Sequence, residues 1–184
     1  EKVFVGIETP DEDSLKECDK TLNIKHNLAD SVEMIQSSGI EVSAGFIVGF
    51  DSDTPGIFQR QIDFIQKSGI ITAMVGLLNA PNRTPLYQRL KREGRILQSH
   101  GGDNTDYSMN FIPRMNKEKL LTGYQQILDG IYSSKAFYIR LKNFLSAFHP
   151  GATIKQRLNR ERIMALLRSI IYIGILSKGR LYYW

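Results

Sequence analysis

A pattern that occurs three times constrains the fold of this chain: an apolar, β-branched run followed by the dipeptide Thr-Pro. The runs and their dipeptides are 3–7 with Thr9-Pro10, 42–50 with Thr54-Pro55, and 70–78 with Thr84-Pro85. Threonine is a favoured helix N-cap, and proline suits the first helical position because its missing N–H would have no partner there. The pattern therefore predicts strand, loop and helix three times, and Thr9 with Glu12 predicts a capping box.

The helices between these runs have a clear apolar period. Leu28, Val32 and Ile35 recur every three to four residues, as do the apolar residues after Pro55. The strands that follow open with Gly39 and Gly69, which are typical of helix C-termini. Because the runs are too continuously apolar for strands buried on one face, they predict a parallel sheet covered by helices, an α/β fold.

The loops after three parallel strands meet at one edge of such a sheet, because crossover connections share one hand. Ligands bind at this carboxyl edge in α/β folds, and helix N-termini there favour anionic or polar groups. Gly45 and Gly49 would let a ligand or another backbone approach closely. Asp51 and Asp53 would accept hydrogen bonds from ligand hydroxyls or cap the next helix. From the residues alone, a ligand site and ordinary packing both remain open.

The three strand ends resemble the second half of the radical S-adenosylmethionine core. The segments are VGIETPDEDSLKECDK at 5–20, GFIVGFDSDT at 45–54 and LLNAPNRTPLYQRL at 77–90. They are most similar to the subgroup that carries a cobalamin-binding domain before that core, and GGDNTDYSMNFIPRM at 101–115 resembles its C-terminal extension. The resemblance implies a fragment of a partial (β/α) TIM barrel at 1–95, with the last three of six strands, and a helical extension with a basic tail at 96–184.

The resemblance also implies a site for S-adenosylmethionine at the strand ends. Glu8 occupies the position whose polar side chain meets the ribose, where a carboxylate accepts hydrogen bonds from two adjacent hydroxyls. Asp53 is expected to open onto the same cleft. The positions implied at the adenine are Gly45, Ile47, Gly49, Leu78 and Asn79.

The chain departs from this family at two loops and in its cysteines. Asp51-Ser52-Asp53 stands where many relatives have Pro-Gly-Glu, and Asn82-Arg83 stands where Pro-Gly is usual. Cys18 is the one cysteine, so this chain alone provides neither a disulfide nor the CxxxCxxC motif that holds the [4Fe-4S] cluster. The cluster and cobalamin are therefore expected only through other parts of a parent enzyme, with methyl transfer as a candidate reaction, and this fragment alone is expected to be inactive.

The second half is predicted to be helical. One apolar face begins near Asn116, and a second helix covers about 134–147, with aromatic residues expected in the core. The segment 101–106 lacks the alternating acids of an EF-hand and is predicted to close over the barrel mouth. His26, His100 and His149 show no pattern for metal binding or nucleophile activation.

Positive charge is concentrated in the tail. Residues 150–184 hold seven basic residues against one acid, Glu161, among many Ile and Leu side chains. The pattern favours a helix docked on the core, with an interfacial helix at an anionic membrane surface as the alternative. Nucleic acid is not an expected partner. A lone cysteine and the absence of a signal-peptide pattern favour a cytoplasmic location, with membrane association as the alternative.

The first strand is expected to lack a neighbour on one edge, because the preceding strand of the barrel is absent from this chain. The upstream half of the barrel and the cobalamin-binding domain are its expected partners in the parent protein; in isolation, we expect a homodimer along 3–7 or coverage of the open face by the C-terminal helices. Two alternatives from other functional classes remain, namely a non-catalytic interaction module and an ordinary (β/α) phosphate-binding domain.

Overall fold

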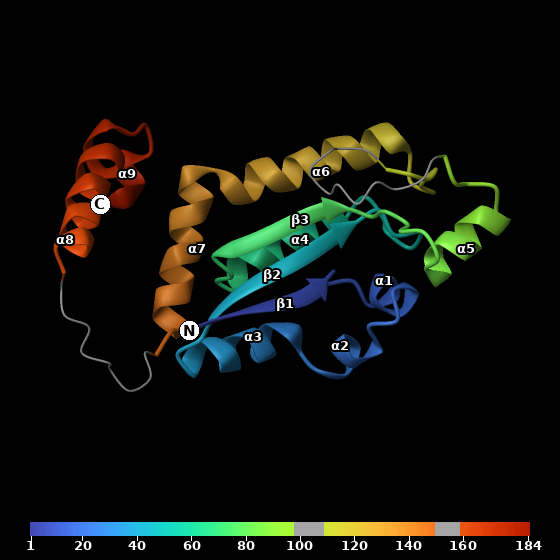
Figure 1. Ribbon diagram of the computed structural model, residues 1–184, viewed down its shortest axis with the longest axis horizontal. Helices are drawn as coiled ribbons and strands as arrows, with labels where there is room; N and C mark the ends of the chain where they lie inside the picture. Colours follow the sequence, from blue (N-terminus) through green and yellow to red (C-terminus); the bar gives the residue numbers. More distant parts are fainter. Residues whose placement is uncertain (98–108, 150–158) are drawn as a thin grey trace.

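Three parallel strands form one sheet in the order predicted (Figure 1). The structure, a computed structural model, describes residues 1–97, 109–149 and 159–184. The strands are β1 (Lys2–Glu8), β2 (Glu41–Val48) and β3 (Thr72–Leu77). β2 ends earlier than the apolar run predicts, because Gly49 adopts a left-handed φ of 108° that turns the chain out of the sheet.

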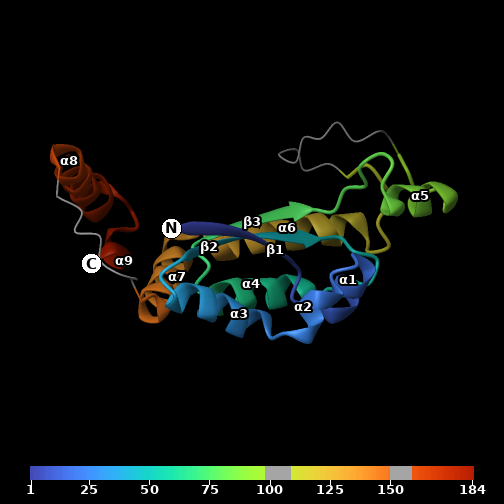
Figure 2. The ribbon, with the colours of Figure 1, turned by 60° about the horizontal axis from the view of Figure 1, so that its bottom comes forward.

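Helices cover one face of the sheet and continue beyond it. Figure 2 shows α3 and α4 beneath the strands, and no described helix covers the opposite face of the sheet. The helices are α1 (Glu12–Glu17), α2 (Thr21–Lys25), α3 (Leu28–Ser37), α4 (Ile57–Lys67), α5 (Pro85–Arg92), α6 (Lys117–Tyr132), α7 (Ser134–Ala147), α8 (Arg160–Ser169), the π-helix η1 (Ile170–Leu176) and α9 (Arg180–Tyr183).

The helix starts agree with the Thr-Pro pattern at one of its three positions. Thr84 caps α5 by accepting from the Tyr87 amide at 3.1 Å. The other two helices begin later, with Asp11 and Gly56 as N-caps, so the predicted capping box of Thr9 is wrong. Thr9 is instead buried, and its hydroxyl accepts from the Asp11 amide. A local side-chain contact thus outweighs helix propensity there.

The covered face of the sheet holds the hydrophobic core. β2 contributes alternate buried side chains to it, while the opposite face leaves Phe4 and Met74 61% and 59% exposed. The core continues past residue 96, so the two predicted parts share one interior; its members from the second part are Met109, Phe111, Leu120, Ile127 and Ile131. The C-terminal helices do not cover the open face, contrary to one expectation.

The outer edge of β3 is occupied by α6. The Leu78 amide donates to the Val48 carbonyl at 2.8 Å, so the carbonyls of Ala73 and Val75, an odd number of residues away, point away from β2. Tyr132 donates its hydroxyl to Ala73 O at 2.6 Å, and Tyr124 donates to Val75 O at 3.0 Å. Two phenol groups therefore take the place of a fourth strand.

A buried arginine joins elements at the other end of the sheet. Arg140 of α7 donates to the carbonyls of Ile131 at 2.8 Å and Ile71 at 3.2 Å, and to Gln66 Oε1 at 3.2 Å. It is 1% exposed, and burial lowers its pKa. The predicted bounds of this helix, 134–147, are confirmed, but its buried residues include this charge as well as Ala136 and Phe144.

Residues 159–184 form a compact helical hairpin beside α7, which we call the C-terminal hairpin (Figure 1). The prediction that the tail docks on the core is wrong for these residues, since only Gly174 and Gly179 among them are buried. No helix in the described parts of the chain is both long and apolar enough to cross a membrane. The tail residues 150–158 lie outside the described residues.

Candidate functional site at the carboxyl edge of the sheet

Glu8 ends β1 in a strained conformation. Its φ of 66° lies in the left-handed region, which is unfavourable for a residue with a side chain. The pairing with β2 shifts register between Gly6 and Glu8, and a Cβ atom at Gly6 would collide with Glu8 Oε1. The carboxylate therefore lies over Gly6, partly exposed, with Lys20 Nζ 3.4 Å away. Backbone strain of this kind is often retained where it orients a functional group.

A cavity of about 350 Å³ lies beside β3 at the same edge. Three of the residues predicted at the adenine, Ile47, Leu78 and Asn79, line it. Gly76 forms part of the floor, where a Cβ atom would meet nothing within 4 Å. Gly45 lies on the same face, and the ring of Phe4 packs over it. The structure thus brings these positions together on the open side of the sheet.

Gly49 and Asp53 face the interior. A Cβ atom at Gly49 would press on Met109 and Leu120. The missing side chain therefore makes room for side chains of the helical extension, and not for a ligand. Asp53 is 9% exposed and accepts hydrogen bonds from the Gly49 and Phe50 amides, at 2.8 and 3.1 Å. Its other oxygen accepts from the Ser14 hydroxyl at 2.8 Å, and burial raises its pKa. Asp53 therefore fixes the loop after β2 and does not open onto the surface beside Glu8.

An arginine cluster around Asp51 was not predicted from the sequence. Arg95 makes a bidentate pair with Asp51 at 2.6 and 2.8 Å, while Arg89 and Arg114 lie 3.3 and 3.5 Å from the same carboxylate. Burial acts to raise the pKa of Asp51, but the hydrogen bond and charge of Arg95, with the other two arginines, hold it below its usual value. Arg89 also pairs with Glu17 at 2.7 Å.

This cluster ties α1, the loop after β2, α5 and the extension together. The sequence offered one signal for this arginine cluster, namely an acid, Asp51, directly after a strand. The three arginines gave no signal, since they lie far from Asp51 in the chain and belong to no motif.

Asn110 connects the extension to the end of β3. It accepts from the Ala80 amide at 2.9 Å and donates to the Ala80 carbonyl at 2.8 Å, as a paired strand would. Its own amide donates to Asn79 Oδ1 at 3.0 Å. The side chain of Asn79 is thus positioned beside the cavity by the extension. The predicted closing loop, 101–106, lies outside the described residues, as does His100.

A second cavity, of about 300 Å³, lies between α1, α5 and the strand ends. Its wall combines Phe50, Leu78 and Leu86 with Glu17 and Cys18. The Cys18 thiol donates to the Leu15 carbonyl, and burial raises its pKa, which disfavours the reactive thiolate. Among the described residues, no group of three His, Cys, Asp or Glu side chains is arranged to hold a metal ion.

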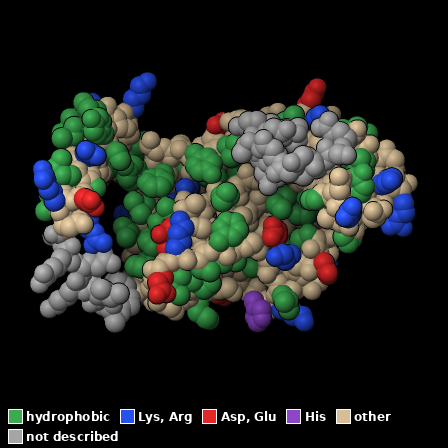
Figure 3. Space-filling model, viewed as in Figure 1, with side chains coloured by type: hydrophobic (Ala, Val, Ile, Leu, Met, Phe, Trp, Pro, Cys, Tyr) green, Lys and Arg blue, Asp and Glu red, His purple; other side chains and the backbone are tan. Residues whose placement is uncertain are grey.

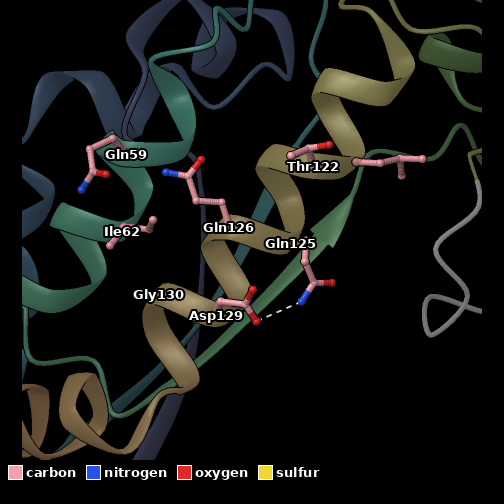
Figure 4. Close-up of a pocket in the computed structure, with 8 residues that line it drawn as sticks. Gln59, Ile62, Thr122, Gln125, Gln126, Asp129 and Gly130 are labelled. Carbon is pink, nitrogen blue, oxygen red and sulfur yellow. Dashed lines mark hydrogen bonds between the residues drawn. The ribbon is translucent and has the colours of Figure 1, made fainter.

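A wide groove of about 940 Å³ contains none of the predicted site residues. It runs between α4 and α6, and Figure 4 shows Gln59 and Ile62 facing Gln126 across it. Gln125 donates to Asp129 at 3.0 Å within the same helix. This wide groove has no set of side chains directed at a common point.

The fold and this edge define the class: a parallel β/α unit with a strained acid and a cavity at its carboxyl edge, joined to a helical extension. A family profile described as "Domain of unknown function (DUF4070)" matches residues 84–184. The chain therefore belongs to the DUF4070 family, which confirms the resemblance to the C-terminal portion of cobalamin-type radical S-adenosylmethionine enzymes.

Two relatives match nearly the whole chain. It is 36% identical over 185 residues to "Uncharacterized methyltransferase sll1242" of Synechocystis sp., and 33% identical over 189 residues to "Hopanoid C-2 methylase" of Rhodopseudomonas palustris. Each alignment covers 99% of this chain, but 34% and 35% of the relatives. The chain thus spans about a third of the length of these relatives.

Proposed function

We propose that this chain forms the ribose and adenine side of the S-adenosylmethionine site in a cobalamin-type radical S-adenosylmethionine methylase. Family membership and the two methyltransferase-type relatives support the enzyme class. The observation that carries the proposal is the left-handed backbone of Glu8, which turns a carboxylate over Gly6 on the open face.

The chemistry of this edge fits an adenosine group. Glu8 has two carboxylate oxygens for adjacent ribose hydroxyls, and Lys20 Nζ lies 3.4 Å from one of them. Ile47 and Leu78 provide apolar surface for a flat ring, while Asn79 and nearby backbone groups provide polar atoms at its edge. Gly76 leaves its part of the sheet face open for close approach, whereas the Phe4 ring packs over Gly45.

Gly49 and Asp53 act indirectly in this proposal. Asp53 holds the amides of Gly49 and Phe50, and thereby fixes the end of β2 next to the cavity. When bound, S-adenosylmethionine supplies the reactive chemistry; this chain binds and orients its adenosine.

The donor set does not fit an iron–sulfur cluster, because such a cluster needs three cysteines and the chain has one. We therefore assign the cluster, cobalamin and the upstream barrel strands to other parts of the parent protein, and expect no activity from this chain alone.

The test measures binding of S-adenosylhomocysteine to the complete protein by titration calorimetry. Glu8→Ala removes a charged acceptor of ligand hydroxyl groups, so affinity should fall by about 1–3 kcal/mol, or roughly 5- to 150-fold. Glu12→Ala, an exposed acid on α1, is the matched control and should bind as the wild type does.

A ribose analogue separates a direct contact from a general loss of structure. Removing the 2′-hydroxyl of the ligand should weaken binding to the wild type, but not weaken binding to Glu8→Ala further. Equal losses in both proteins would exclude Glu8 as the partner of that hydroxyl.

A further inference from the structure

The C-terminal hairpin has almost no interior of its own. Its apolar side chains are exposed along all three helical segments, from Ile163 in α8 to Trp184, the last residue. Those more than half exposed are Leu166, Tyr172, Ile175, Leu176, Leu181 and Trp184, with Leu181 at 84% and Trp184 at 77%. Soluble surfaces rarely carry so continuous an apolar patch unless something binds it.

A few contacts hold the hairpin together and join it to the rest. Trp184 Nε1 donates to the Gly174 carbonyl at 2.9 Å, and Tyr183 lies edge-on to Tyr138 of α7, with ring centres 6.2 Å apart. Gly179 packs closely against Ser134. These contacts use the backbone and two aromatic rings of the hairpin, and leave most of its aliphatic side chains exposed.

Basic residues flank and separate the apolar segments of the hairpin. The hairpin has five, Arg160, Arg162, Arg168, Lys178 and Arg180, against one acid, Glu161. None of the five forms an ion pair within the described parts of the chain. Figure 3 shows these basic groups among the hydrophobic side chains at the left of the molecule.

This combination distinguishes between two kinds of occupant. The core of a protein–protein interface is depleted in charge. Here Arg162 lies four residues before the exposed Leu166 in α8, and Arg168 lies four residues after the exposed Met164, so basic and apolar side chains share a side of this helix. Basic and apolar residues intermixed on short helices suit the boundary between anionic headgroups and acyl chains, where Trp and Tyr are also enriched. The helices are too short to span a bilayer, which agrees with a position in the plane of its surface.

We propose that the C-terminal hairpin is a peripheral membrane-binding element for surfaces that contain anionic lipid. Its exposed aliphatic and aromatic side chains enter the headgroup–acyl boundary, and its basic residues bind lipid phosphate groups. The hairpin lies at one end of the molecule beside α7, so it tethers the sheet without covering its open face (Figure 2).

Flotation of the complete protein with lipid vesicles tests this proposal. We expect it to float with phosphatidylcholine vesicles containing roughly a quarter phosphatidylglycerol, and much less with phosphatidylcholine alone. Salt should weaken the binding, because each basic residue near an anionic surface contributes about a fivefold gain in affinity that salt screens.

Paired variants locate the binding surface. Arg162→Glu with Lys178→Glu, and separately Leu176→Ser with Leu181→Ser, should each lower vesicle affinity about tenfold or more. The matched controls change exposed residues outside the hairpin: Lys117→Glu with Lys119→Glu on α6, and Leu22→Ser with Met34→Ser on α2 and α3. The controls should float as the wild type does.

Three results would overturn the proposal. One is failure of the wild type to float with anionic vesicles, and another is an equal loss of binding in the control variants. The third is that the hairpin variants keep vesicle binding but lower the urea midpoint of the complete protein, since the hairpin would then cover a face of the same protein.

Discussion

Replacing Arg140 tests whether a buried charge joins α7 to the sheet. The guanidinium makes three hydrogen bonds to acceptors on three different segments, at 2.8, 3.2 and 3.2 Å, and its Nε has no partner among the described residues. Arg140→Met keeps most of the volume but leaves the carbonyls of Ile131 and Ile71 and the amide oxygen of Gln66 without this donor. Arg140→Lys keeps the positive charge but loses the planar guanidinium, whose N–H groups reach several acceptors at once.

The expected magnitude follows from opposing terms. Hydrogen bonds from a charged donor contribute about 1.5–3 kcal/mol each, but the arginine also loses its hydration, which costs several kcal/mol. We therefore expect Arg140→Met to lower the free energy of unfolding by about 3 kcal/mol and Arg140→Lys by about 2 kcal/mol. For a chain of this size, the larger loss lowers Tm by roughly 6–12 °C.

Urea unfolding of the chain, followed by circular dichroism, measures both losses. Trp184 fluorescence would be a poor probe, because this residue lies in the C-terminal hairpin and not in the core. Lys142→Met, at an exposed position of the same helix, should change stability by no more than about 0.5 kcal/mol. If Arg140→Met is as stable as the wild type, the hydration cost of the guanidinium cancels its bonds, and the arginine does not join these elements.

Two further predictions concern the loop after β2. Asp51→Asn should cost about 2–4 kcal/mol in urea unfolding because it leaves Arg95 without its bidentate partner, whereas Glu93→Gln should cost less than about 1 kcal/mol; equal costs would contradict the central role of Asp51. Burial raises the pKa of Asp53, so the folded protein binds this proton more tightly than the unfolded chain, and this contribution is lost as pH rises through the folded pKa. Between pH 7 and pH 4, the wild type should therefore gain stability relative to Asp53→Asn, and an unchanged difference between their urea midpoints would contradict that pKa shift.

The parallel sheet was predictable because local signals agreed with each other. The apolar runs, the helix-ending glycines and the direction of the crossovers all favoured one arrangement, and Gly39 and Gly69 have the positive φ expected of them. The strand ends were less predictable. The Thr-Pro pattern identified the loops but not the helix starts, since Thr9 is used to bind its own loop.

The candidate site was predicted in part. The resemblance to a known family indicated Ile47, Leu78 and Asn79, and the structure places all three around one cavity. The inward orientation of Asp53 was not predicted, because it depends on a contact with Ser14, which lies 39 residues away. The grouping of three arginines around Asp51 likewise depends on contacts between distant segments, which no local pattern contains.

The two phenol groups on β3 make growth of the sheet directional. Tyr124 and Tyr132 already donate to the carbonyls that a further strand beyond β3 would need. On β1, by contrast, no hydrogen bond in the described part of the chain satisfies the outward backbone groups of Lys2 and Phe4. Any strand supplied from outside must therefore join at β1, next to Glu8, and cannot join beyond β3. The carboxylate of Glu8 would then lie at the seam between the two contributions, and the geometry of that seam would control how the carboxylate meets a ligand.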